Sequence, residues 1–374
     1  MASILMINVP YSGHTNPTLP LASELVKRGH KVFYINAEEF REKIEATGAG
    51  FIPYINYPSN PSEQEKKTKC FRAAFETALS IKVRIDLLIY EMFFFPGIRI
   101  AEILGIPCVR QFSQPAWSKE NVRDASIFFR ISCMLIDMQV MGKKNVDFMQ
   151  LKNKSLMQAV LYDKPDLNIV YVPEVFQPYR NSFGDNYLFI KPRLQPPLSK
   201  QVIPYREMRR PIIYISLGSI ISNKGFCKEC IRAFGGKKLT VILITGRVNP
   251  QALGKIPDNI YAYSFVPQIE VLSKADVFLT HCGMNSINEA MTLGVPMVAM
   301  PFINDQISNG KRVVELGIGK KVRSFPSSGR ELYATCLSVI KDEKIKKRCQ
   351  ELQMELKKEE NFEKIIVEIE KLLV

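Results

Sequence analysis

Short apolar runs alternate with longer amphipathic segments through the first third of the chain. The apolar runs have strand length and lie at Ile4–Val9, Lys31–Ile35, Gly50–Tyr54, Asp86–Tyr90 and Pro107–Gln111. Segments with the helical period lie between them at Thr18–Lys27, Glu38–Thr47 and Gly97–Leu104. Strands that alternate with helices in this way predict a parallel sheet with helical crossovers, which is the α/β class.

Residues 57–82 and 114–165 interrupt this alternation. Both segments read as helices and long loops that are rich in Phe, Met and charged residues. In a doubly wound sheet, insertions beyond the carboxyl ends of the strands line the ligand crevice. We therefore expect these two segments to shape a binding pocket.

A basic, proline-rich stretch divides the chain near its middle. Lys191–Arg210 contains Pro192, Pro196, Pro197 and Pro204, a composition that is typical of an interdomain linker. The chain has 374 residues, 46% of them hydrophobic, which is enough to bury two cores. We expect a boundary between residues 195 and 210, with one domain at residues 1–200 and a second at residues 201–360.

Residues 325–374 read as helices up to the chain end. The last of them has apolar positions at Ile365, Ile366, Ile369, Leu372 and Leu373. Such a face suits a membrane surface or packing against the protein. Because acidic residues interleave with basic ones, we favour a helix at residues 361–374 that packs back on the first domain.

The densest group of polar candidates lies between Phe265 and Asn309. Val277–Thr280 reads as a buried strand, followed by a helix that opens at Asn285 or Ser286 and closes at Gly294. The start of a helix directs free N–H groups and the positive end of the helix dipole at the space above the strand, which favours an anion.

Several side chains add to this anion site. Ser286 offers a hydroxyl, His281 a hydrogen-bond donor, and Glu289 an acceptor suited to ribose hydroxyls, while Gly283 permits close approach of the backbone. A strand-glycine-helix turn alone is usually only a connection, and an Asn-Ser pair is usually only a cap. The combination indicates a site for a nucleoside diphosphate.

At this point the chain resembles the inverting UDP-glycosyltransferases of family 1, which have the GT-B fold, in the style of bacterial macrolide and natural-product glucosyltransferases. The resemblance lies in the ordered elements Phe265-Val266-Pro267-Gln268, His281-Cys282-Gly283-Met284-Asn285-Ser286, Glu289, Gly294-Val295-Pro296, Pro301 and Asp305-Gln306. It implies two Rossmann-like domains facing a cleft, the first for the acceptor and the second for the UDP-sugar. Many plant members carry Trp where Met284 stands.

The resemblance assigns the donor residues one by one. The uracil would be contacted by Phe265, Val266 and Gln268, and the ribose by Glu289. The pyrophosphate would be held by His281, Gly283, Asn285 and Ser286, and the sugar hydroxyls by Asp305 and Gln306. The segment Ser216-Leu217-Gly218-Ser219 matches a second family segment that faces the phosphates, with Ser219 as the candidate contact.

The catalytic candidate is His14, directly after the first predicted strand in Ser12-Gly13-His14-Thr15-Asn16-Pro17. An imidazole has a pKa near neutrality and can take a proton from an alcohol. A single His in such a loop is more often structural. The family carries Gly-His-x-Asn-Pro here, however, and the resemblance implies that His14 is the general base.

A base of this kind needs an acidic partner that fixes its tautomer. In the family this is usually an Asp just past the fourth strand, whereas here Glu91 follows Asp86–Tyr90. Glu91 is one methylene longer, so the backbone or the rotamer must adjust to keep the distance. Asp86 is a poor substitute because it begins the strand.

The resemblance then implies a single inverting displacement. His14, oriented by Glu91, deprotonates the acceptor hydroxyl, which attacks the anomeric carbon of a UDP-sugar as UDP leaves. The UDP-sugar, with glucose as the expected sugar, is a donor substrate, and no cofactor is expected. Glu91 and Asp305 stand alone rather than in a D-x-D arrangement, so we expect no metal.

The acceptor is the least defined part. Phe93-Phe94-Phe95, Phe112 and Trp117 would form an apolar wall if they face the cleft, and they could equally be core. We expect a small, largely apolar, hydroxylated acceptor of natural-product, macrolide or phenolic type. Three alternatives stay open: a lipid-linked or membrane acceptor, a UDP-sugar epimerase, and a non-catalytic UDP-sugar binder.

The formal net charge of +14 raises the question of nucleic acid or membrane binding. The basic excess is spread over both halves of the chain, whereas a nucleic-acid surface would be clustered with stacking aromatics. We expect no nucleic-acid partner, and peripheral membrane contact through the basic surface stays open. We expect a monomer or weak dimer.

Cysteine usage and the lack of an apolar stretch of membrane-spanning length favour a cytoplasmic protein. The eight cysteines follow no disulfide framework. Cys227 and Cys230 form a C-x-x-C without a second pair at zinc spacing. We expect them to pack in the first turns of a helix.

Overall fold

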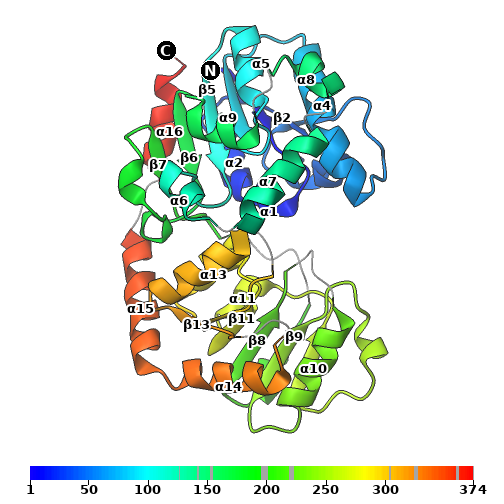
Figure 1. Cartoon of the computed structure of the whole chain (residues 1–374), viewed down its shortest axis with the longest axis vertical. Helices are drawn as coiled ribbons and strands as arrows, with labels where there is room; N and C mark the ends of the chain where they lie inside the picture. The colour runs from blue at the N-terminus through cyan, green and yellow to red at the C-terminus, as the bar shows by residue number, and fades with distance from the viewer. Residues whose placement is uncertain are drawn as a thin grey trace. The chain divides into compact units, whose positions relative to one another are not determined.

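A computed structural model describes residues 1–125, 127–140, 143–151, 155–194, 201–218, 223–302, 305–323, 327–358 and 362–373. The chain divides into two compact units (Figure 1). Unit 1 comprises Met1–Arg193 with Glu360–Val374, and unit 2 comprises Leu194–Glu359. The division thus falls just before the stretch from 195 to 210.

Unit 1 is built on a seven-stranded sheet in the order β3-β2-β1-β4-β5-β6-β7, and all neighbouring pairs are parallel. Its strands are β1 (Ser3–Ile7), β2 (Lys31–Asn36), β3 (Gly50–Pro53), β4 (Leu87–Glu91), β5 (Cys108–Phe112), β6 (Leu167–Val170) and β7 (Tyr187–Phe189). The sheet grows in opposite directions from β1 and β4, which makes this pair the topological switch point. Ile7 pairs with Tyr90, so the loops after β1 and β4 leave the sheet side by side.

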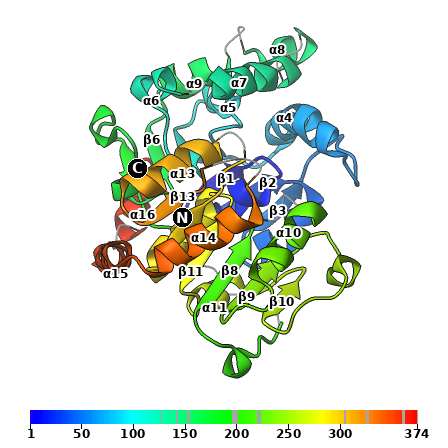
Figure 2. The ribbon, with the colours of Figure 1, turned by 60° about the horizontal axis from the view of Figure 1, so that its bottom comes forward.

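Helices of unit 1 also form in residues 57–82 and 114–165, the two segments that interrupt the alternation. The helices of unit 1 are α1 (Ser12–Thr15), α2 (Leu19–Lys27), α3 (Arg41–Glu45), α4 (Glu63–Ser80), α5 (Gly97–Leu104), α6 (Lys119–Arg123), α7 (Ile127–Val140), α8 (Lys143–Met149), α9 (Leu156–Tyr162) and α16 (Phe362–Lys371). Short 3-10 turns lie at Asn16–Thr18, Glu38–Phe40, Glu174–Phe176 and Arg180–Ser182. Helix α4 packs against α7 and α8, and α7 packs against α9 (Figure 2).

The helix predicted at Glu38–Thr47 is shorter than expected. A 3-10 turn at Glu38–Phe40 precedes α3, which ends at Glu45. The backbone of Phe40, with ψ of −3°, turns the chain between the two pieces, and its side chain is buried in the core. The buried Phe40 thus lies at the junction between two short helical pieces instead of inside one continuous helix.

Helix α16 packs within unit 1. Phe362, Ile365, Ile366 and Ile369 are buried, which accounts for the apolar face seen in the sequence. At its polar side, Glu363 pairs with Arg28, and Glu370 lies 3.4 Å from His30 Nε2. In the part of the chain that the structure describes, no helix has the length and apolar character needed to cross a membrane.

Unit 2 repeats the architecture with six parallel strands in the order β10-β9-β8-β11-β12-β13. The strands are β8 (Ile212–Ser216), β9 (Thr240–Ile244), β10 (Ile260–Tyr263), β11 (Val277–Thr280), β12 (Met297–Ala299) and β13 (Gly319–Lys321). The switch point lies between β8 and β11, where Ser216 pairs with Thr280. The segments after these two strands therefore meet at one edge of the sheet.

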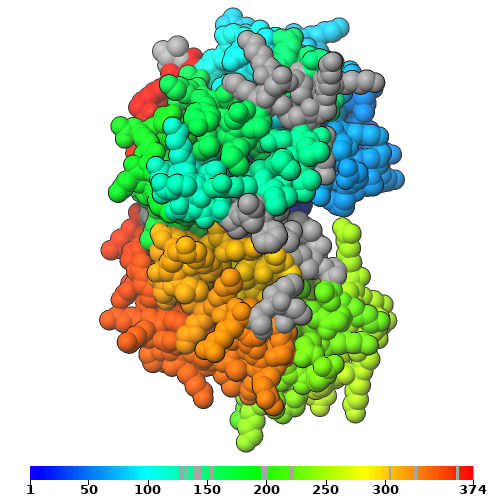
Figure 3. Space-filling model, viewed as in Figure 1, coloured from blue at the N-terminus to red at the C-terminus, as the bar shows by residue number. Residues whose placement is uncertain are grey.

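The helices of unit 2 surround this sheet, and α14 and α15, in orange, form much of its surface in the space-filling view (Figure 3). They are α10 (Lys224–Phe234), α11 (Gln268–Leu272), α12 (Met284–Leu293), α13 (Asp305–Glu315), α14 (Gly329–Ile340) and α15 (Glu343–Lys358), with 3-10 turns at Tyr205–Glu207 and Pro250–Leu253. Cys227 and Cys230 lie on α10, as expected, and are buried packing residues.

Candidate active site

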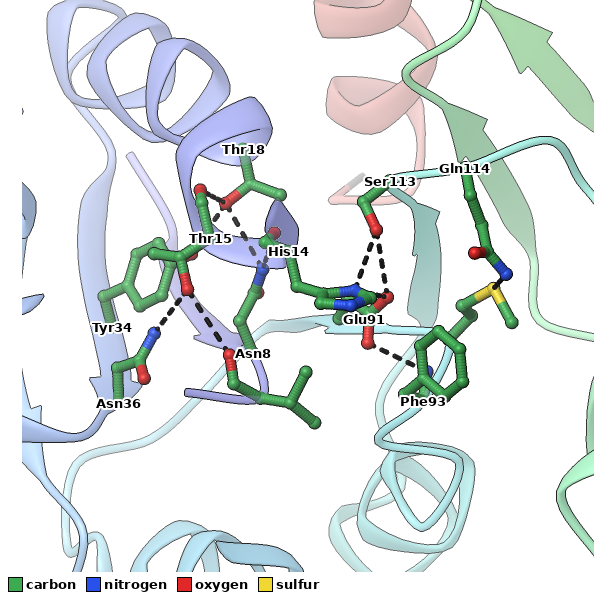
Figure 4. A network of polar contacts seen from close by, with 12 residues as sticks. Asn8, His14, Thr15, Thr18, Tyr34, Asn36, Glu91, Phe93, Ser113 and Gln114 are labelled. Atoms are coloured by element: carbon green, nitrogen blue, oxygen red, sulfur yellow. Dashed lines mark hydrogen bonds and ion pairs between the residues drawn. The ribbon is translucent and has the colours of Figure 1, made fainter. Parts of the chain in front are cut away.

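His14 and Glu91 meet at the switch point of unit 1. His14 lies on α1 directly after β1, and its Nδ1 is 2.9 Å from Oε1 of Glu91, the last residue of β4 (Figure 4). The Glu91 side chain is fully buried, whereas the imidazole is 24% exposed. A carboxylate only accepts hydrogen bonds, so Nδ1 carries the proton and the lone pair stands on Nε2.

The longer side chain of Glu91 is held at both of its oxygens. Oε2 accepts a hydrogen bond from the backbone N–H of Phe93 at 2.8 Å, while Oε1 faces His14. The sequence placed Glu91 just after the strand, and the structure makes it the last residue of β4. Anchoring at Phe93 fixes the rotamer, which is how the extra methylene is accommodated.

A buried polar network fixes the short helix that carries His14. Asn8 Nδ2 donates to the His14 carbonyl at 2.9 Å, and Asn36 Nδ2 donates to Thr15 Oγ1 at 3.0 Å. Thr18 Oγ1 donates to the Thr15 carbonyl at 2.9 Å. Asn8, Asn36, Thr15 and Thr18 are fully buried, so the backbone at His14 is positioned before any ligand arrives.

The aromatic residues after Glu91 divide between site and core. The ring of Phe93 meets His14 edge to face with centroids 5.0 Å apart, and Trp117 meets Phe93 in the same way at 6.2 Å. Phe94, Phe95 and Phe112 are instead nearly fully buried in the core. The apolar wall suggested by the sequence is therefore reduced to Phe93 and to Trp117, which contacts Phe93.

In unit 2, α12 begins one or two residues earlier than predicted. It starts at Met284, and its N-cap is Gly283 in an extended conformation with no side-chain cap. The chain reaches this point through Cys282, whose φ of 68° lies in the left-handed region, and this turn sets the helix start before Asn285. Because no N-cap side chain takes up the first N–H groups, these groups suit an anion.

Two glycines enclose the imidazole of His281. A Cβ on Gly218 would lie 2.6 Å from His281 Cε1, and a Cβ on Gly283 would lie 2.5 Å from His281 Nε2. The close approach of the two backbone segments therefore requires glycine at both positions. Burial lowers the pKa of His281 to about 4, against a smaller opposite effect of a hydrogen bond with the Ser216 backbone.

His281 is therefore expected to weaken the fold in mild acid. An unfolded histidine titrates near pH 6.5, so the stability contributed by the neutral ring is present above this value and is lost as the pH falls toward about 4. Urea unfolding at pH 7 and pH 5 should show a loss of about 2 kcal/mol from this residue. His281→Asn should show a correspondingly smaller loss, and equal losses in both proteins would contradict the assignment.

A second group of candidates in unit 2 is joined by Gln268. Its Nε2 donates to Glu289 Oε2 at 2.5 Å and to Ser286 Oγ at 3.2 Å, while its Oε1 accepts a hydrogen bond from Tyr214 at 2.9 Å. Burial raises the pKa of Glu289, and the hydrogen bond from Gln268 lowers it. The structure thus connects α11 and α12 through three residues that the sequence singled out separately.

The remaining donor candidates lie around this group or near the turn after β11. Val266 is buried and Phe265 is 60% exposed. At the start of α13, Asp305 Oδ2 accepts a hydrogen bond from Asn309 Nδ2 at 3.4 Å, and Gln306 Oε1 accepts one from the Phe302 N–H at 3.0 Å. Ser219 lies outside the described residues.

Two residues at these sites were missed by the sequence reasoning. Ser113 follows β5 and lies 2.8 Å from His14 Nδ1. Asn309 is buried and donates to the Cys282 carbonyl at 3.1 Å, which ties α13 to the turn before α12. The position of Ser113 just past a strand of the parallel sheet was a usable signal, since the carboxyl ends of neighbouring strands share an edge.

Among the residues that the structure describes, no three or more His, Cys, Asp or Glu side chains are grouped so that they could hold a metal ion. The chemistry available at the two switch points is thus a histidine-carboxylate pair in unit 1 and an uncapped helix start with hydroxyl, imidazole and carboxyl groups in unit 2. The first can move a proton, and the second can hold a phosphorylated ligand.

Comparison with known proteins agrees with this geometry. The family model described as UDP-glucoronosyl and UDP-glucosyl transferase matches residues 173–362. The NDP-glycosyltransferase YjiC of Bacillus licheniformis is 31% identical over 99% of this chain and 97% of its own length. The oleandomycin glycosyltransferase of Streptomyces antibioticus is 24% identical over 96% of this chain and 88% of its own.

Solved structures give the same result for the fold. The glycotransferase of kitacinnamycin superposes with a TM-score of 0.86 at 25% identity, covering 100% of this chain and 99% of that one. Together with the two parallel sheets and the family match, this similarity defines the fold as GT-B. The chain belongs to the UDP-glucuronosyl and UDP-glucosyl transferase family and is a glycosyltransferase.

Proposed function

We propose that the protein transfers a hexose, with glucose as the expected sugar, from a UDP-sugar to a hydroxyl of a small, largely apolar acceptor, with inversion at the anomeric carbon. The observation that carries this proposal is the pairing of His14 with the buried Glu91 at the switch point of unit 1. In a glycosyltransferase, this pair supplies the proton acceptor that attack by an alcohol requires.

His14 acts through Nε2 in this mechanism. The acceptor hydroxyl gives its proton to Nε2 as its oxygen attacks the anomeric carbon from the face opposite the diphosphate. Glu91 holds the Nδ1 proton and stabilises the imidazolium that forms. One bond from the acceptor oxygen to carbon forms, the bond from carbon to the diphosphate oxygen breaks, and UDP leaves.

Unit 2 holds the donor in this proposal. The N–H groups at the start of α12, the Ser286 hydroxyl and the neutral His281 imidazole face the diphosphate and stabilise the charge that develops on it. Glu289 accepts the ribose hydroxyls, and Gln268 fixes its carboxyl group. Asp305 and Gln306 bind the sugar hydroxyls, and no metal is needed for the departure of UDP.

We expect an apolar acceptor because aromatic side chains lie beside His14. The ring of Phe93 contacts the His14 ring, and the ring of Trp117 contacts Phe93. The name of one relative indicates action on oleandomycin, which supports a hydroxylated natural product as the acceptor class. A phenol or macrolide would place its hydroxyl at His14 and its apolar body against Phe93.

Gly283→Ala is expected to weaken donor binding. Its φ of −63° accepts alanine, so the effect arises only from the new Cβ, 2.5 Å from His281 Nε2. The displaced ring disturbs the turn that leads into α12 and moves its first N–H groups away from the diphosphate, and KM for the UDP-sugar should rise about tenfold or more. Gly184→Ala is the matched control, because its Cβ would meet only Asn186 Oδ1 at 3.7 Å. An unchanged KM in Gly283→Ala would contradict the role of His281.

The test of the function is UDP release from UDP-glucose with a panel of phenols, macrolides and lipid acceptors, with product mass as the second readout. Release that depends on a phenol or macrolide supports the proposal, and a β-linked product supports inversion. UDP release only with lipid acceptors would mean that the acceptor is a lipid and not a phenol or macrolide. A changed nucleotide sugar without an acceptor would indicate an epimerase, and UDP binding without turnover would indicate a binding protein.

A further inference from the structure

The side chain of Ser113 contacts both members of the catalytic pair. It lies directly after β5, is 5% exposed, and places Oγ 2.8 Å from His14 Nδ1 and 3.5 Å from Glu91 Oε1 (Figure 4). The three side chains lie on α1 after β1, at the end of β4 and directly after β5, and these three strands are neighbours in the sheet.

The protons in this group can be arranged in one consistent way. The Glu91 carboxylate only accepts, so His14 Nδ1 carries its proton and directs it at Oε1 and at the Ser113 oxygen. The Ser113 hydroxyl proton then points at Glu91 Oε1, the only one of its two partners that can accept it. Ser113 is thus an acceptor for the base and a donor to the carboxylate at the same time.

The alternative arrangement would disable the base. If Glu91 were protonated, or if Ser113 donated to Nδ1, the ring proton would move to Nε2, and no lone pair would face the acceptor. A buried carboxylate is stabilised by each hydrogen bond that it accepts. Glu91 accepts one at Oε2 from the Phe93 N–H, and Ser113 adds a donor at Oε1 beside His14.

We propose that Ser113 is a positioning residue, which holds His14 in the tautomer with Nε2 unprotonated by completing a three-residue group with Glu91. This role rests on the proposed function of His14 as base. The proposed group has three members rather than the His14-Glu91 pair alone, because Glu91 Oε1 faces both His14 Nδ1 and Ser113 Oγ.

The direct test is the protonation pattern of the His14 ring, read by nitrogen NMR on histidine-labelled protein. The chain has three histidines, and the His14 signals are those missing from His14→Ala. In the wild type the Nδ1 proton should be seen, and in Ser113→Ala a fraction of molecules should carry the proton on Nε2 instead. Thr47→Ala removes a hydroxyl that bonds the Ile44 carbonyl at the far edge of unit 1, and it should leave the pattern as in the wild type.

Kinetics provide the second readout. Ser113→Ala should lower kcat about tenfold to a hundredfold, as expected for one hydrogen bond to a charged group, with KM for the UDP-sugar unchanged and with an altered pH profile of kcat. Ser113→Thr keeps the hydroxyl and should recover part of kcat. An unchanged His14 protonation pattern in Ser113→Ala, together with kcat within about twofold of the wild type, would overturn the proposal.

The two proposals fail in different ways. If the wild type releases no UDP with any acceptor, the proposed function is wrong, but the NMR pattern still reports whether Ser113 determines the tautomer of His14. If transfer is observed and the His14 pattern does not respond to Ser113, only the positioning role falls.

Discussion

Replacement of His14 by alanine is expected to lower kcat for transfer by a factor of about 10² to 10⁴. The imidazole is the proton acceptor that is paired with the buried Glu91 carboxylate at the switch point of unit 1. Without it, the acceptor hydroxyl must lose its proton to water during attack. The factor corresponds to about 3–5 kcal/mol of transition-state stabilisation.

KM for the UDP-sugar should stay close to the wild-type value in this variant. The donor candidates lie in unit 2, and removal of a proton acceptor in unit 1 changes the transition state rather than binding of the ground state. The measurement is initial-rate UDP release at varied donor concentration, with product detection by mass.

His30→Ala is the matched control for this experiment. It removes the same side chain from the same unit, at a site where the ring lies 3.4 Å from Glu370 on α16, and transfer should continue at the wild-type rate. Equal rates for His14→Ala and the wild type would exclude His14 as the base. A loss in both variants with a lower melting temperature would indicate destabilisation of unit 1.

The sequence was informative where one short segment carries both the element and the chemistry. The strand at Val277–Thr280 was predicted with its observed bounds, and the helix after it ends at Leu293 before Gly294, as expected. The fold class was confirmed by the two parallel sheets and the structural neighbours. Gly294, with φ of 70°, marks a helix end that a side chain with a Cβ would disfavour.

The sequence was less informative where contacts join distant segments. Ser113 is 99 residues from His14, and its place just past a predicted strand indicates only the edge of the sheet that it shares with His14, not the contact itself. The partition of Phe93, Phe94 and Phe95 between site and core depends on the turn after β4, which alternation alone does not define. The start of α12 was misplaced because the turn uses Gly283 and the left-handed Cys282 rather than a polar cap.

Glu91→Gln is expected to lower kcat about 10²- to 10³-fold while leaving the shape of the site intact. The amide can keep the hydrogen bond from the Phe93 N–H through its oxygen. Its NH₂ group would then face His14 and donate to Nδ1, which holds the proton on Nε2. With its proton on Nε2, the ring cannot accept the proton of the acceptor hydroxyl there, and the negative charge that stabilises the imidazolium is lost as well.

Glu91→Asp tests the length of the side chain separately from its negative charge. The carboxylate remains, but it is one methylene shorter, so the 2.9 Å contact with His14 Nδ1 must lengthen or the helix must shift. Because the buried network around Asn8 and Thr15 resists a shift of α1, we expect a loss of about tenfold in kcat, smaller than that of Glu91→Gln. A larger loss in Glu91→Asp than in Glu91→Gln would mean that Glu91 acts through its length alone, and its charge would then have no part in orienting the base.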